Sequence, residues 1–135
     1  MNQSPVDVVK TAFERFFGGD VDGATALMHD DMVVEFHGPP PIAYAGTFTG
    51  RAGAARFFNA VAESVDINAF ETEQHLCDGD TVTVTGWLDL TVKATGKPIK
   101  THFAHVITVR DGKWSRFRDF QDSAAAVEAF TPDQD

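Results

Sequence analysis

Residues 105–122 read HVITVRDGKWSRFRDFQD, a stretch in which apolar and polar side chains alternate on both sides of a short turn. This alternation predicts two antiparallel strands joined by a hairpin turn. Because successive side chains of a strand point to opposite faces, the second strand has two unlike surfaces. One surface carries Ser115, Phe117, Asp119 and Gln121, and the other carries Trp114, Arg116, Arg118 and Phe120. The face that turns inward decides whether His105 shares a buried surface with a carboxylate or with two arginines.

The pairing across this turn has two possible registers. If the two residues DG make the turn, His105 lies opposite Arg118. If RDG forms a three-residue loop that ends in a left-handed glycine bulge, His105 lies opposite Phe117 and diagonal to Asp119. We favour the three-residue loop, because the strand before the turn carries its apolar residues at odd positions. Two arginines turned into that apolar face would be buried without partners, at a cost of several kcal/mol each.

The rest of the chain predicts helices first and hairpins afterwards, which is the order of an α+β protein. Residues 5–17 have apolar side chains at helical spacing, with a Ser-Pro start and a Gly-Gly stop. A long helix over residues 51–65 is expected to bury Ala55, Phe58, Val61, Ala62 and Val65. The remaining expected elements are a short helix at 21–28, a strand at 32–36, a stiff loop at 37–50, and strands at 67–77, 80–93, 98–110 and 113–121.

Composition places the chain among globular proteins and limits its partners. A length of 135 residues is typical of one domain. The twelve phenylalanines, against one tyrosine, predict an apolar core or an apolar cavity. A net charge of −9 argues against nucleic acid as a partner. No signal-peptide pattern or bilayer-spanning apolar run is present, so we expect no membrane partner and a cytoplasmic location. Cys77 is the single cysteine and is given no role.

The order of these elements, together with four motifs, resembles the nuclear transport factor 2-like superfamily, in particular its SnoaL-like and ketosteroid-isomerase-like members. The motifs are GD at 19–20, MHDDMVVEFHGPPP at 28–41, FTGRAGAARFF at 48–58 and HVITVRDGKWSRFRDFQDSAAAVEAF at 105–130. The resemblance implies a single domain over residues 1–135 with a cone-shaped, cystatin-like α+β fold. In that fold, three N-terminal helices pack on a strongly curved, mainly antiparallel sheet that leaves a concave apolar pocket. It does not imply a reaction, because the fold hosts isomerases, cyclases, dehydratases, epoxide hydrolases and members without catalysis.

Departures from the ketosteroid isomerase pattern argue against steroid isomerisation. The catalytic base of that family falls where this chain has Phe36, and its helix-1 tyrosine falls near Ala12 or Phe13. A SnoaL-like cyclase or hydratase is the closer relative. The Asp-Arg-Asp set of the epoxide hydrolases is not assembled on the favoured register, since Arg118 then points away from the face of Asp119.

Asp119 and His105 are the candidate catalytic pair, because carboxylate and imidazole are the usual groups for moving a proton next to a carbonyl. His-Asp pairs of SnoaL-like cyclases look similar. A buried His-Asp hydrogen bond with a purely structural role is the alternative. Tyr44, in the loop over the pocket, is a candidate hydrogen-bond donor or a lid residue. The candidate substrate-binding residues are Phe13, Phe16, Phe36, Tyr44, Phe58, Phe103, Phe117 and Gln121.

The sequence therefore predicts an enzyme that acts on a hydrophobic carbonyl compound by acid/base chemistry, of polyketide cyclase, isomerase or dehydratase type. The alternative is a non-catalytic module that binds a hydrophobic ligand in the same pocket. No cofactor is expected, because no Gly-rich phosphate loop follows a strand. No metal site is expected either, since His102 and His105 are three apart on a strand and point to opposite faces.

A homodimer through the outer face of the sheet is expected, as the resemblance to ketosteroid-isomerase-like proteins also implies. On the favoured register this face is too apolar for a solvated surface. A two-fold axis through it would let its arginines meet acidic residues such as Asp89 of the partner subunit. Alternatively, residues 122–130 fold back over part of the face and leave a monomer. The outer face is expected to present Trp87, Asp89, His102, Ala104, Val106, Trp114, Arg116, Arg118 and Phe120.

Overall fold

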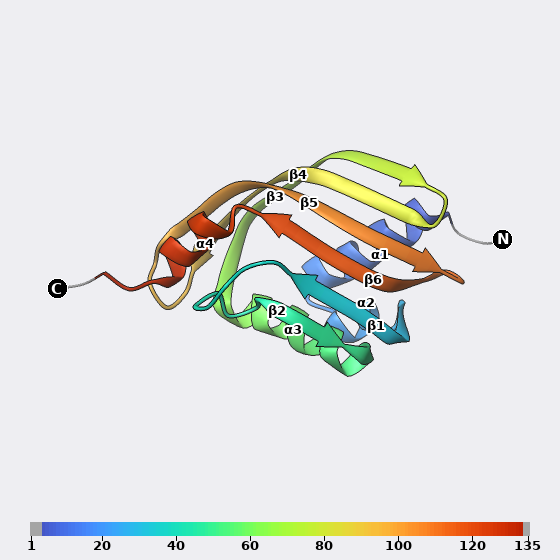
Figure 1. Ribbon diagram of the computed structural model, residues 1–135, viewed down its shortest axis with the longest axis horizontal. Helices are drawn as coiled ribbons and strands as arrows, with labels where there is room; N and C mark the ends of the chain where they lie inside the picture. Colours follow the sequence, from blue (N-terminus) through green and yellow to red (C-terminus); the bar gives the residue numbers. More distant parts are fainter. Residues whose placement is uncertain (1–3, 134–135) are drawn as a thin grey trace.

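The computed structural model describes residues 4–133, in which helices cover one six-stranded sheet (Figure 1). The α+β class expected from the sequence is confirmed. The helices are α1 (Pro5–Phe17), α2 (Val21–Thr25), α3 (Gly50–Ser64) and α4 (Ser123–Phe130). The strands are β1 (Met28–Phe36), β2 (Gly46–Thr49), β3 (Val65–Asp78), β4 (Thr81–Val92), β5 (Pro98–Arg110) and β6 (Lys113–Gln121).

The sheet has the strand order β2-β1-β6-β5-β4-β3 and is antiparallel except where β1 runs parallel to β6. Its long strands bend strongly, and α1 and α3 lie on the concave side (Figure 1). The β1–β6 pair joins the beginning of the chain to its last strand. Both ends of the sequence therefore contribute to the concave face on which the candidate site lies.

Helix α1 begins and ends as its sequence predicts. The Ser4 hydroxyl accepts a hydrogen bond from the Asp7 amide at 3.2 Å, Pro5 occupies the first turn, and Gly18 is the C-cap. Gly19 follows with a φ of 85°, a left-handed conformation that glycine adopts without a steric penalty. The helix buries Val8, Val9 and Ala12 and extends its three phenylalanines along the concave face of the sheet.

Helix α3 presents a different face to the core from the one expected. Within α3 the structure buries Gly53, Ala54, Phe57 and Phe58. Of the expected positions, Phe58 is buried in the helix and Val65 is buried as the first residue of β3, whereas Ala55, Val61 and Ala62 are not fully buried. Phe57 packs edge-on against Phe48 of β2 at 5.5 Å between ring centroids. This contact explains the rotation, because the short strand β2 was expected to be loop and its aromatic side chain was not counted as core.

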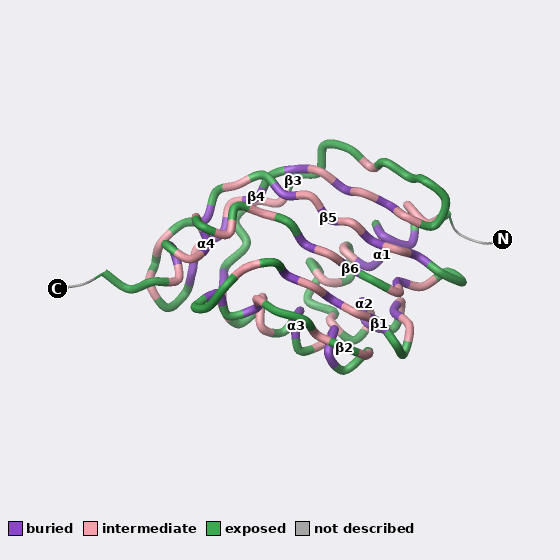
Figure 2. The backbone as a smooth tube through the Cα atoms, in the orientation of Figure 1, coloured by how far each residue is buried: buried purple, intermediate pink, exposed green. Residues whose placement is uncertain are grey.

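Strands β4 and β5 alternate as the sequence periodicity predicts, whereas β3 and the shorter elements differ. The short helix ends at Thr25 rather than at residue 28, and β1 starts at Met28 rather than at residue 32. Strand β2, which pairs with the end of β1, falls inside the expected loop. Figure 2 shows buried positions alternating mainly with intermediate ones along the central strands, while the edge strand β3 is mostly exposed. No helix in residues 4–133 has the length and apolarity needed to cross a bilayer.

The β5–β6 turn has two residues, so the expected three-residue loop is wrong. Arg110 pairs with Lys113, which leaves Asp111 and Gly112 as the turn. Their φ angles of 53° and 74° are both positive. Two positive φ angles define the hairpin turn whose twist matches that of the strands, and Asp-Gly is one of its preferred sequences.

A β-bulge at Ser115 then shifts the pairing of β5 with β6 by one residue. Trp114 pairs with Val109, but the next pair joins Arg116 to Thr108, so Ser115 has no partner in the ladder. The Ser115 hydroxyl donates to the Thr108 carbonyl at 3.3 Å. The extra residue returns the strand to the inward alternation expected from the sequence, so that His105 lies directly opposite Asp119.

The bulge also decides which side chains point inward. Phe117 and Asp119 are buried with His105, whereas Arg116 is exposed and Arg118 lies on the opposite face of the strand. Trp114 was expected on the outer face, but it is fully buried and contacts the Phe117 ring at 5.4 Å between centroids. Two inward side chains three residues apart are possible because the bulge adds one residue between them.

Candidate functional site

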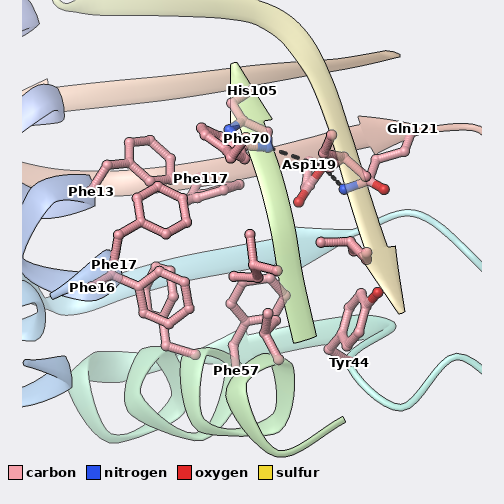
Figure 3. A pocket seen from close by; sticks show the side chains of 15 residues that line it. Phe13, Phe16, Phe17, Tyr44, Phe57, Phe70, His105, Phe117, Asp119 and Gln121 are labelled. Atoms are coloured by element: carbon pink, nitrogen blue, oxygen red, sulfur yellow. Dashed lines mark hydrogen bonds and ion pairs between the residues drawn. The ribbon is translucent and has the colours of Figure 1, made fainter. Parts of the chain in front are cut away.

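An elongated apolar cavity lies between the concave face of the sheet and the two long helices (Figure 3). Asp119, Gln121 and Tyr44 lie at one end of it, and the phenylalanines of α1 lie at the other (Figure 3). Phe17 and Ile67 line the cavity while being 43% and 37% exposed, so they mark its mouth. The lining residues are Phe13, Phe16, Phe17, Tyr44, Phe57, Phe58, Val61, Ile67, Phe70, Leu88, Leu90, His105, Phe117, Asp119 and Gln121.

Asp119 is 5% exposed and holds a carboxylate inside this aromatic enclosure. Its Oδ1 accepts a hydrogen bond from Gln121 Nε2 at 3.1 Å and lies 3.4 Å from His105 Nε2. The contact with His105 is close enough for an ion pair but lacks the geometry of a hydrogen bond. Two groups therefore gather around one carboxylate oxygen, while no hydrogen bond within the described chain reaches Oδ2.

The His105 imidazole is packed among aromatic rings. Its centroid lies 4.3 Å from that of Phe103, 4.9 Å from Phe117, 5.5 Å from Phe13 and 5.9 Å from Phe70. Within residues 4–133, neither ring nitrogen has a hydrogen-bond partner. The rings fix the position of the imidazole, while its two nitrogen atoms remain free to interact with Asp119 and with a ligand in the cavity.

Tyr44 brings a hydroxyl group to the same end of the cavity. The residue is 3% exposed, and its Oη is buried without a hydrogen-bond partner in the described part of the chain. Burial, and in second place the negative charge of Asp119, raise the pKa of Tyr44 well above its usual range. At neutral pH the group is therefore an O–H donor.

Most of the expected site residues line the cavity, but two do not. Phe36 is buried beneath Tyr44, with its ring edge-on at 5.0 Å, and Phe103 stacks between His105 and Phe70. Both support the site from the core rather than forming its wall. The wall also contains residues that sequence analysis did not name: Phe17, Phe57, Val61, Ile67, Phe70, Leu88 and Leu90.

Two features of the sequence could have identified some of these wall residues. Phe17 follows Phe16 at the end of an amphipathic helix that lies along the concave face. Leu88 and Leu90 alternate on the same face of β4 as the buried Val84. By contrast, β3 has register shifts between Ile67 and Ala69 and between Thr72 and Gln74, which strict alternation does not predict.

The other histidines and the arginines lie away from this cavity. His102 is exposed on the opposite face from His105, as its position three residues away predicts. Arg116 pairs with Glu35 at 2.7 Å on the outer face of the sheet. In the described range 4–133, no cluster of three or more His, Cys, Asp or Glu side chains is placed to bind a metal.

The fold and the matched sequence define the class of this protein. Residues 9–117 match the model of the SnoaL-like domain family, and the chain belongs to this family. No curated protein matches the sequence.

Solved structures extend the likeness over almost the whole chain. A nuclear transport factor 2-like protein from Burkholderia xenovorans LB400 is 29% identical, with a TM-score of 0.88, and the match covers 97% of this chain and 98% of the other. TerC, crystallised with polyporic acid, is 26% identical, with a TM-score of 0.80 and coverage of 94% and 98%. A Xanthomonas campestris protein of unknown function with a cystatin-like fold is 21% identical, with a TM-score of 0.77 and coverage of 98% and 100%. This last likeness shows the fold alone.

Proposed function

We propose that this protein is an enzyme that moves a proton on or off a carbon atom next to the carbonyl group of a hydrophobic small molecule. Asp119 is the acid/base group and His105 is its partner. The observation that carries the proposal is a carboxylate and an imidazole, on side chains only 7% and 4% exposed, inside an aromatic cavity. Polar groups of perturbed environment inside an apolar cleft are candidates for catalysis.

The proposed step transfers one proton and leaves an enolate. The C–H bond next to the carbonyl breaks, the proton goes to the Asp119 carboxylate, and the electron pair moves to the carbonyl oxygen. The reverse transfer returns the proton to the same or another carbon. Cyclases, isomerases and dehydratases all use such a step, so the geometry supports these reaction types together rather than one of them.

The ligand class follows from the cavity wall. Its aromatic side chains favour a flat, apolar molecule, while the polar groups gather at one end (Figure 3). TerC, a protein of the same fold, was crystallised with polyporic acid. We take polyporic acid as a binding probe for this chain on that basis.

Deuterium exchange into 2-tetralone, a bicyclic aromatic ketone, tests the enzyme. In D2O the wild-type protein is expected to accelerate exchange at the carbon between the ring and the carbonyl, as followed by NMR. Asp119→Asn should lower the protein-catalysed rate by at least about 100-fold, while affinity for polyporic acid stays within about tenfold. Asp31→Asn, which makes the same change on an exposed carboxylate, is the matched control.

The same experiment separates the enzyme from a binding module of the same fold. Equal exchange rates for wild type and Asp119→Asn would contradict the enzymatic role of the carboxylate. Binding of polyporic acid without any exchange by the wild-type protein would support the non-catalytic module instead.

The protein is further proposed to form a homodimer through the outer face of the sheet. Trp87 and Phe120 are 41% and 38% exposed on this face, on either side of β5. The Phe120 ring stacks on His37 at 4.8 Å and lies under the Arg118 guanidinium. A two-fold axis through this face would bring the Arg118 guanidinium to Asp89 of the partner subunit.

Helix α4 leaves this surface open. It packs beside the start of β5 and against Tyr44 through Phe130, at 5.6 Å between ring centroids. Light scattering at micromolar concentration should give the mass of a dimer for the wild type and of a monomer for Trp87→Glu. Asn59→Glu, on the exposed side of α3, is the control and should remain dimeric. A monomeric wild type would end the dimer hypothesis.

A further inference from the structure

Tyr44 occupies a fixed position although it lies in the loop between β1 and β2. Its ring contacts Phe36 of β1 at 5.0 Å, Phe130 of α4 at 5.6 Å and Phe57 of α3 at 6.2 Å between centroids, in each case nearly edge-on. Three elements far apart in the sequence thus hold one ring. A lid residue that swings freely would not be enclosed on three sides in this way.

The Tyr44 hydroxyl has no structural use in the described part of the chain. It is buried and makes no hydrogen bond, so a phenylalanine would fill the same space without leaving a polar group unpaired. The hydroxyl lies on the side of the ring that faces Asp119 and Gln121 (Figure 3). Its pKa is raised by burial and by Asp119, which keeps the proton on the oxygen. The group is therefore a buried donor without an acceptor, placed beside a carboxylate.

The contacts of Asp119 show which group is free to donate to a ligand. His105 Nε2 and Gln121 Nε2 both lie beside Oδ1, at 3.4 and 3.1 Å. Both side chains therefore lie against the Oδ1 side of the carboxylate. Oδ2 accepts no hydrogen bond from residues 4–133, which leaves it as the oxygen that can take a proton. Tyr44 lines the same cavity, and its hydroxyl makes no hydrogen bond in residues 4–133, so it is free to donate to a carbonyl oxygen.

We propose that Tyr44 donates a hydrogen bond to the carbonyl oxygen of the substrate while Asp119 Oδ2 takes the proton from the neighbouring carbon. This inference rests on the proposed function. The C–H bond breaks, its proton passes to Oδ2, and its electron pair forms an enolate whose oxygen accepts the Tyr44 hydrogen bond. Tyr44 keeps its own proton throughout.

The arrangement also orients the substrate. The carbonyl group enters first and lies at the end of the cavity formed by Tyr44 and Asp119. The apolar body extends along the phenylalanines of α1 toward the exposed Phe17 (Figure 3). The substrate class is accordingly a ketone with the carbonyl at or near one end of a flat apolar skeleton.

Tyr44→Phe removes the hydroxyl and keeps the ring in its three-sided enclosure. The rate of 2-tetralone exchange at saturation should fall about 100- to 1000-fold, as for loss of one oxyanion donor, while KM changes less than about threefold. A second measurement does not depend on turnover. Binding of 2-naphthol, the aromatic analogue of the tetralone enol, should weaken about tenfold in Tyr44→Phe, as measured by the change in naphthol fluorescence.

The outcomes separate this inference from the proposed function. Exchange that Asp119→Asn abolishes and Tyr44→Phe leaves unchanged would refute the role of Tyr44 and keep that of Asp119. A wild-type protein without exchange would refute the proposed function, and the naphthol measurement would then decide on Tyr44 as a ligand donor. Equal naphthol affinity in wild type and Tyr44→Phe would overturn the inference. Phe130→Leu, which alters the enclosure and not the hydroxyl, should reduce both quantities less than Tyr44→Phe does.

Discussion

Replacing both members of the His105–Asp119 pair by apolar residues is expected to cost far less stability than replacing either one. His105→Phe alone leaves a buried carboxylate without its partner, which should lower the free energy of unfolding by about 3 kcal/mol. Asp119→Leu alone leaves an imidazole without a polar partner among four phenylalanine rings, at a cost of about 2 kcal/mol. If these losses were independent, the double variant would lose about 5 kcal/mol.

The structure predicts a much smaller loss for the double variant, of about 1 kcal/mol or less. The side chains of His105 and Asp119 are only 4% and 7% exposed, their 3.4 Å contact lacks hydrogen-bond geometry, and the aromatic surroundings suit a phenylalanine at position 105. The remaining cost comes from the Gln121 amide, which loses the carboxylate to which it donates a hydrogen bond. This cost is small because Gln121 is half-buried and its amide can turn toward solvent. The His105–Asp119 pair is therefore expected to add no stability to the fold compared with two apolar residues at the same positions.

Urea unfolding followed by tryptophan fluorescence measures all four free energies in one series. The buried Trp114 reports the transition, and equal m-values across the series would show that the same cooperative unit unfolds. A double variant within about 1 kcal/mol of wild type supports the prediction. A double variant that loses the sum of the two single losses would refute it, and would favour a structural role for the pair.

Two further predictions concern single positions. Gly86→Ala should lower the free energy of unfolding by about 2 kcal/mol, because a Cβ there would collide with the Glu71 carbonyl oxygen and crowd Phe103. Gly96→Ala should cost about half as much, because Gly96 has a φ of 75° but open space around it. Equal losses of the two variants in urea unfolding would contradict the steric explanation. Because the pKa of Tyr44 is raised on folding, the folded state keeps a proton that the unfolded state releases above its usual pKa of 10.0, so stability should fall as pH rises past that value. This alkaline loss should be smaller in Tyr44→Phe, and near-UV absorbance of the single tyrosine should show ionisation only on unfolding.

The sequence predicted the long elements because their periodicity is set by large apolar side chains. Helix α1 has the bounds that its caps predict, and β5 and β6 have the bounds that their alternation predicts. Strand β2 was missed because its four residues are mostly polar or small and only Phe48 packs inward. The rotation of α3 was missed for the same reason, since the partner of Phe57 was not known to be a strand.

The register of the β5–β6 hairpin could not be predicted from local sequence rules alone. A rule for turn length treats the two strands as uninterrupted ladders, and neither of the two registers considered contains a bulge beyond the turn. The sequence does hold a signal, because Trp114 and Phe117 are both large and apolar but three residues apart, which one uninterrupted strand cannot bury together. From Phe117 onward the inward face was still predicted correctly, because burying two unpaired arginines costs several kcal/mol each, but Trp114 before the bulge was placed on the wrong face.

The unpaired polar groups of the cavity are the strongest argument that its inner end has a ligand. A core built for stability alone would place apolar residues at positions 44, 105 and 119, where the surroundings are almost entirely aromatic. Each buried polar atom left without a partner costs about 1–3 kcal/mol, a large part of the stability of a domain of this size. Tyr44, His105 and Asp119 nevertheless come together from a loop and two strands, held by rings from α1, α3, α4 and β3. A ligand that accepts a hydrogen bond from Tyr44 and is contacted by Asp119 Oδ2 would offset this cost, because it would give the unpaired hydroxyl a partner inside the cavity.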